Sequence, residues 1–193
     1  MTNTAIKTDH IVNGIDTARI VELATKMSQD DNYGNFRFRA DNEWVNGNLS
    51  RTAIKDFYAG NEERTERAHA LIVAADQPAF LAGDNTAPNA VEHYLNSLVS
   101  CITTTVVAHA SVQGFAIRAF NVSAEGEMDA RGFFGVSDDA NRGFSKVRVD
   151  VKAKTSADEA TVRKLMSYSP VYELVSKAIP VDVNITVEQL TRV

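Results

Sequence analysis

The sequence has very little cysteine: Cys101 is the only one in 193 residues, alongside four histidines and four prolines. A single cysteine cannot form a disulfide within the chain, so an oxidising compartment offers no structural benefit and a cytoplasmic location is expected. The histidines are scattered without the spacing of a zinc site, and no glycine-rich phosphate loop or nucleophile elbow is present. The sequence therefore predicts neither a metal nor a cofactor.

The excess of one sign of charge over the other is also small. The chain has 20 basic and 25 acidic residues, for a net charge of −5, which argues against partners such as nucleic acid or an anionic membrane surface. The first seven residues lack the apolar core of a secretory signal. The one long uncharged segment, residues 94–117, contains asparagine, threonine and glutamine. We interpret it as a buried helix and not as a membrane span.

Apolar periodicity predicts an α+β domain, because strands and helices follow each other in separate groups. We expect helices near 17–28, from about 88 to Gly114, from 156 onward, and from a cap at Ser169 and Pro170 to about 178. Ser156 with Glu159 is a candidate capping box for the third of these. The expected strands are 36–54 with a turn at 46–48, 68–74, 117–128, 144–154 and 181–187.

Cys101 lies in the middle of the long apolar helix. A free cysteine at such a place commonly packs as a small hydrophobic residue. It becomes reactive where a cation or a helix N-terminus favours the thiolate, but the start of this helix is about three turns away. His93 and His109 lie eight residues on either side and cannot activate the thiol from within the helix. An arginine from elsewhere in the fold would have to supply the charge.

The segment from Pro88 to Cys101 is the most specific motif of the chain: a proline and a Glu-His-Tyr-Leu run lead into a helix with a cysteine. This motif resembles that of the OsmC/organic hydroperoxide resistance family. The Arg-Gly-Phe-Phe-Gly run at 131–135, followed by the strand at 144–151, resembles the next loop and strand. Ser169-Pro170-Val171 occupies the place of the family's Cys-Pro-Val element. The resemblance covers roughly residues 35–188.

This resemblance implies an antiparallel sheet packed on long central helices, in an intertwined homodimer. Residues 1–34 would be an N-terminal extension with one helix, and 35–193 the OsmC-like domain. Active members of the family reduce organic hydroperoxides. A thiolate attacks the peroxide oxygen, and a second cysteine resolves the resulting sulfenic acid to a disulfide. An arginine, held by a glutamate, stabilises the developing negative charge.

Residue by residue, the resemblance assigns the peroxidatic cysteine to Cys101, the glutamate to Glu92 and the arginine to Arg51, which follows a glycine-containing turn. Arg37 or Arg39 are alternatives to Arg51. Without a catalytic role, Arg51 would be an exposed strand residue and Glu92 a first-turn acid favoured by the helix dipole. On a straight helix Glu92 and Cys101 lie about 180° apart, so they would meet only through a bend, a long arginine or a partner subunit.

Ser169 departs from the family's pattern in a way that decides the mechanism. A serine hydroxyl cannot resolve a sulfenic acid, so the internal disulfide cycle is excluded and an external thiol reductant is required. The expected function is reduction of small organic hydroperoxides through Cys101 alone. The alternatives are a non-catalytic protein that binds an apolar small molecule and a redox sensor that is modified at Cys101 without turnover.

Overall fold

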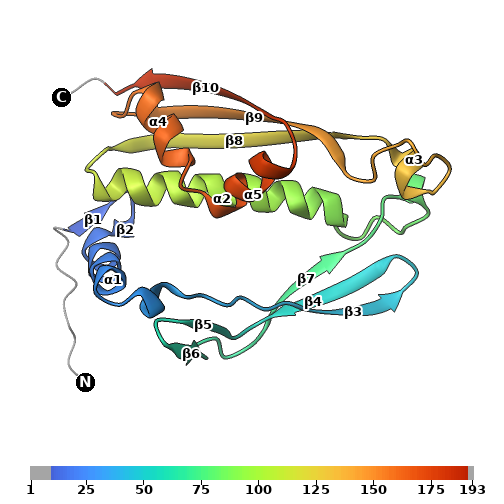
Figure 1. The fold of residues 1–193 in the computed structure, drawn as a ribbon, viewed down its shortest axis with the longest axis horizontal. Coiled ribbons are helices and arrows are strands. Elements are labelled where there is room, and N and C mark those ends of the chain that lie inside the picture. Colours follow the sequence, from blue (N-terminus) through green and yellow to red (C-terminus); the bar gives the residue numbers. More distant parts are fainter. Residues whose placement is uncertain (1–9, 191–193) are drawn as a thin grey trace. The chain divides into compact units, whose positions relative to one another are not determined.

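The computed structural model describes residues 10–190, and these form two compact units. Of the described residues, the first unit, here called the core unit, comprises 10–18 and 95–190. The second, the strand unit, comprises Arg19–Tyr94. The domain boundary expected between residues 34 and 35 stays a prediction. Figure 1 shows the order of the elements along the chain.

The core unit is built on one long helix and one sheet. The predicted helices and strands of this region are confirmed, most of them to within a few residues. In chain order the elements are β1 (Ile11–Val12), β2 (Ile15–Asp16), α2 (Ala90–Val112, which begins in the strand unit), β8 (Ile117–Met128), α3 (Ala130–Phe133), β9 (Phe144–Thr155), α4 (Glu159–Met166), α5 (Pro170–Ala178) and β10 (Val181–Gln189). The α+β class expected from the sequence is therefore confirmed.

The sheet of the core unit has the strand order β10-β9-β8. β8 and β9 pair antiparallel over their whole length, as consecutive strands joined by a loop do. β10 pairs parallel to β9, so the sheet is mixed where the sequence led us to expect an antiparallel one. The reason is the connection: α4 and α5 together return the chain to the end of the sheet at which β9 began.

The hydrophobic core lies where α2 packs on this sheet, and Figure 1 shows the helix running along the three strands. Buried residues follow each other on α2 at intervals of four, which places them on one face of the helix. The apolar ones are Leu98, Ile102, Val106 and Ala110, and Ser111 is buried next to the last of them. Among the described residues α2 is the one helix long and apolar enough to cross a membrane by length and composition, a property that core helices share.

A small hairpin, β1–β2, is fastened to the end of α2 by one side chain. Asn13 donates from Nδ2 to Ser111 Oγ at 3.0 Å and to the carbonyl of Phe115 at 2.9 Å. Its Oδ1 accepts the backbone N–H of Ile117 at 2.9 Å. The helix itself ends as predicted at Gly114, whose φ of 76° suits glycine. The hairpin thus closes the turn between α2 and β8.

Two details of the core unit differ from the sequence expectations. The segment expected to be loop after β8 contains the short helix α3 (Ala130–Phe133). The cap of α4 is Asp158, whose side chain accepts the backbone N–H of Thr161 at 2.8 Å. Ser156 instead accepts the backbone N–H of Ala116 at 3.0 Å, so the predicted capping box is wrong. The Ser156 hydroxyl, which the local pattern assigned to the cap of α4, is instead bonded to the backbone at the start of β8.

The strand unit contains short strands in two small sheets, of order β3-β4-β7 and β5-β6. The predicted helix near 17–28 and the hairpin turning at 46–48 are confirmed. In chain order the elements are α1 (Thr17–Gln29, which begins in the core unit), η2 (Asp31–Gly34), β3 (Asp41–Asn46), β4 (Leu49–Ile54), β5 (Phe57–Ala59), β6 (Glu62–Arg64), β7 (Leu71–Ala75) and η3 (Ala79–Leu81).

This unit has almost no hydrophobic core. Ala59, at 6% exposure, is the one apolar residue of 19–94 that is buried. Large apolar side chains of its strands and loops are exposed instead, among them Phe38 (74%), Trp44 (69%) and Ile72 (61%). Because a sheet with one apolar face needs another layer to cover it, these exposed side chains indicate that the strand unit is not complete by itself.

A buried carboxylate organises the loop that leads into α2. Asp76 is 3% exposed and accepts the backbone N–H of Gln77 at 2.8 Å. It also accepts the backbone N–H and the hydroxyl of Thr86, at 3.0 and 2.8 Å. These bonds, chiefly the one from the Thr86 N–H, hold the pKa of Asp76 below its ordinary value although burial opposes the charge. The carboxylate therefore fastens residues 84–88 to the end of β7.

The lowered pKa makes a prediction about stability. A carboxyl whose pKa is depressed in the folded state stabilises that state above its ordinary pKa, near 3.8, and loses this contribution as pH falls through the folded value. We expect Asp76→Asn to lower the urea midpoint of unfolding at pH 7, and the difference from the parent to shrink below about pH 4. The exposed Asp138 provides the control, Asp138→Asn. A difference that is the same at pH 7 and at pH 3 would contradict this role.

Candidate functional site

Cys101 is positioned by the packing of α2. In the sequence it lies between Leu98 and Ile102, both fully buried against the sheet. Cys101 is next to this buried face of the helix and is itself only partly buried. The neighbouring residue on its other side, Ser100, is exposed. A thiol in this position is held rigidly by the core on one side while its other side remains within reach of solvent.

The sulfur of Cys101 is in contact with one buried hydroxyl, that of Ser169. Ser169 donates from Oγ to Cys101 Sγ at 3.1 Å and is 0% exposed. The same oxygen accepts the backbone N–H of Tyr172 at 3.2 Å, because Ser169 is the N-cap of α5 with Pro170 in the first turn. The start of α5, with its positive dipole end, is therefore beside the sulfur.

The three candidate arginines all lie in the strand unit, and they differ in their partners. Arg37 places its guanidinium 4.1 Å from the ring centroid of Tyr58, a cation–π contact. Arg39 makes two hydrogen bonds of 2.8 Å to the carboxylate of Glu63. Within the described residues, the guanidinium of Arg51 has no hydrogen-bond or ion-pair partner. Of the three, Arg51 is the one whose charge is not already engaged.

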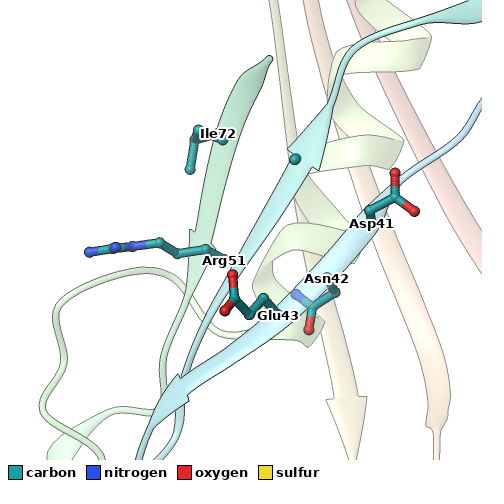
Figure 2. Close-up of a pocket in the computed structure, with 6 residues that line it drawn as sticks. Asp41, Asn42, Glu43, Arg51 and Ile72 are labelled. Carbon is teal, nitrogen blue, oxygen red and sulfur yellow. The ribbon is translucent and has the colours of Figure 1, made fainter.

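Arg51 lines an open groove of about 480 Å³ on the β3-β4-β7 sheet. Across the pair of strands it is opposite Glu43. Figure 2 shows its guanidinium extending away from Glu43 and out of the sheet, with Ile72 on the neighbouring strand. The groove thus combines the cation of Arg51 with the carboxylates of Asp41 and Glu43 and with the apolar side chains of Ala53 and Ile72. It offers both polar and apolar contacts to a small organic molecule.

Glu92 caps the helix on which Cys101 lies. Its Oε2 accepts the backbone N–H of Asn89 at 2.7 Å, and the side chain of Asn89 accepts the N–H of Glu92 at 2.9 Å. This reciprocal pair is a capping box, and the Asn-x-x-Glu spacing was visible in the sequence. Within the strand unit as described, Glu92 and Arg51 form no ion pair. The catalytic roles of Glu92 and Arg51 stay predictions.

The structure brings Cys101 and Ser169 together and leaves Arg51 and Glu92 in the strand unit. Sixty-eight residues separate the cysteine from the serine, so only their family positions, and no local pattern, pointed to the contact. The buried Asp76 was missed altogether, because a carboxylate after a strand resembles any solvated loop residue in sequence. In residues 10–190 no group of three His, Cys, Asp or Glu side chains is placed to hold a metal ion.

The short contact between Cys101 and Ser169 predicts that a cysteine at 169 will form a disulfide with Cys101. A sulfur is larger and bonded at greater length than the 169 oxygen, which is already 3.1 Å from Sγ, so a small adjustment brings two sulfurs to bonding distance. We expect Ser169→Cys to lose two hydrogens by mass and to resist alkylation at both thiols after mild oxidation with diamide. The parent, with one thiol, should remain alkylatable.

The matched control is Ser176→Cys, an exposed position on the same helix α5. It lies about 10 Å further along the helix axis and gives the chain the same number of thiols. Internal disulfide in this control, or its absence in Ser169→Cys, would contradict the geometry described for the two side chains.

Comparison with known proteins gives the family. The family model "OsmC-like protein" matches residues 83–184, just over half of the chain, and so includes both Cys101 and Ser169. No curated protein is a match to this sequence.

Solved structures share the fold at low sequence identity. An OsmC-like protein of unknown function from Vibrio cholerae is 10% identical over 78% of this chain and 99% of its own, with a TM-score of 0.58. An OsmC-like protein from Mycoplasma pneumoniae is 11% identical over 78% and 96%, with a TM-score of 0.57. An organic hydroperoxide resistance protein from Legionella pneumophila is 16% identical over 77% and 96%, with a TM-score of 0.50. With the family match over helix, site and sheet, this chain belongs to the OsmC-like protein family.

Proposed function

We propose that this protein reduces organic hydroperoxides through Cys101 and that an external thiol completes the cycle. The observation that carries the proposal is the partly buried thiol of Cys101, in contact with a serine that cannot resolve it. Family membership supports the choice of substrate class, since the similar protein from Legionella pneumophila is an organic hydroperoxide resistance protein.

The chemistry proceeds in three balanced steps. The Cys101 thiolate attacks the outer oxygen of the hydroperoxide; the S–O bond forms, the O–O bond breaks, and the leaving alkoxide takes a proton to become the alcohol. A small external thiol then attacks the sulfur of the sulfenic acid, which forms a mixed disulfide and releases water. A second thiol attacks the mixed disulfide, releases the oxidised reductant as a disulfide, and regenerates Cys101.

In this proposal Arg51 stabilises the negative charge that develops on the leaving oxygen. Its guanidinium has no partner among the described residues, and it lines a groove that also holds apolar surface and the carboxylates of Asp41 and Glu43. Arg37 and Arg39 are engaged by Tyr58 and Glu63, so they suit this role less well. A cation beside a developing oxyanion stabilises the transition state electrostatically.

We also propose that the active form is a homodimer, as the family resemblance implies. The support is the strand unit: large apolar side chains in it are exposed, and among its described residues Ala59 is the one buried apolar residue. A second copy of the chain would cover this apolar surface. We further propose that the protein is cytoplasmic, because small thiols are available there as reductants.

The first test of the function is to trap the oxidised cysteine. Treatment with cumene hydroperoxide and dimedone should give one adduct, located at Cys101 by mass spectrometry and absent from Cys101→Ser. Arg51→Ala should slow adduct formation by about tenfold or more, because it removes a charge-stabilising donor, while Arg37→Ala and Arg39→Ala should change the rate little. With dithiothreitol or dihydrolipoamide present, the parent should consume many equivalents of hydroperoxide.

The outcomes separate the alternatives. If the adduct forms but no thiol reductant supports turnover, the protein is a redox sensor and not a peroxidase. No adduct at hydroperoxide concentrations far above that of the protein would make Cys101 a packed thiol and leave binding of an apolar small molecule as the function.

The dimer has its own test in the single tryptophan, Trp44, which is 69% exposed in the single chain. Covered by a partner, its emission should lie at shorter wavelength than that of a solvent-exposed indole and move to longer wavelength as the protein is diluted. Light scattering should give twice the 21.1 kDa mass of the chain at the higher concentrations. A mass of one chain, together with emission that does not depend on concentration, would rule out the homodimer.

A further inference from the structure

The hydroxyl of Ser169 makes two hydrogen bonds. Its oxygen accepts the N–H of Tyr172 at 3.2 Å, and the partner on its other side is Cys101 Sγ at 3.1 Å. The residue is 0% exposed, so water does not compete for the bond. A buried donor is thus aimed at the sulfur and held there by its second task as the cap of α5.

We propose that Ser169 is a positioning residue for Cys101: its hydroxyl fixes the orientation of the sulfur and stabilises negative charge on it. This rests on the proposed function and adds to it a role for the serine that stands at the family's second-cysteine position. Hydrogen bonds to charged groups are stronger than those between neutral ones. A donor fixed in advance also needs no reorganisation when the thiolate reacts.

The contact also sets the direction of attack. Ser169 fills the buried side of the sulfur, so the hydroperoxide and then the external thiol must approach from the side of α2 that is open to solvent. The hydroxyl keeps its proton throughout. The S–O bond forms on the open side, the O–O bond breaks, and the alkoxide takes its proton from solvent, so no atom of Ser169 is consumed.

A purely steric or structural role makes a different prediction. Removing the hydroxyl opens space beside the sulfur, so a steric role predicts faster reaction of Cys101 with small reagents. A capping role predicts lower thermal stability without a change in the rate at Cys101. Only a donor role predicts a slower reaction from a smaller side chain.

The experiment compares Ser169→Ala and Ser169→Gly with Ser169→Thr, in the full-length protein at pH 7. Two rates are measured at Cys101: alkylation by iodoacetamide, and oxidation by cumene hydroperoxide followed with dimedone. We expect about a tenfold slower alkylation in both hydroxyl-free variants, the size of effect that a hydrogen bond to a charged group carries. The two variants should be alkylated at the same rate, although glycine caps a helix better than alanine. Ser169→Thr, which keeps the donor, should restore most of the rate.

Asp158→Ala is the control for capping, because it removes the cap of α4 in the same unit without contacting Cys101. It should lower the melting temperature and leave both rates unchanged. Equal or faster alkylation in Ser169→Ala and Ser169→Gly would overturn the proposal for Ser169. If instead the parent is alkylated but never oxidised by hydroperoxide, the proposed function fails, while the alkylation series still decides the role of Ser169.

Discussion

The packing of α2 on the β10-β9-β8 sheet is the constraint on which the site depends. Leu98, Ile102, Val106 and Ala110 fix the rotation of the helix, because each is buried against the sheet. Once that rotation is set, Cys101 can only lie beside the buried face, neither inside the core nor on the far side of the helix. The return of the chain through α4 and α5 then places Ser169 at the sulfur.

The two units are stabilised by different interactions. The core unit buries a continuous set of apolar side chains from helix and sheet, so it has the features of an independent hydrophobic core. The strand unit has carboxylate-centred and backbone bonds, as at Asp76 and at the capping box of Asn89 and Glu92, but little buried apolar surface. Local hydrogen bonds contribute modestly to net stability, so the strand unit has less to stabilise it than the core unit.

Ser169 stands where the family resemblance places a second cysteine, and a serine cannot form a disulfide. Both residues are small, and the serine additionally caps α5 through the N–H of Tyr172. What the site loses is an internal route from sulfenic acid to disulfide. What it keeps is a buried polar group in contact with the sulfur. In the proposed cycle this step falls to a thiol from solution, which fits the partial exposure of Cys101.

The sequence by itself determined the elements, because apolar periods, glycines and caps act over a few residues: the helix ending at Gly114, the hairpin at 46–48 and the cap at Ser169 followed from local patterns. It also singled out Cys101 as the one residue for thiol chemistry. The tertiary structure alone decided which groups meet: the 3.1 Å contact of Ser169 with Cys101, the engagement of Ser156 by Ala116, and the parallel pairing of β10. These join segments far apart in the chain, and their geometry is set by core packing that no local pattern encodes.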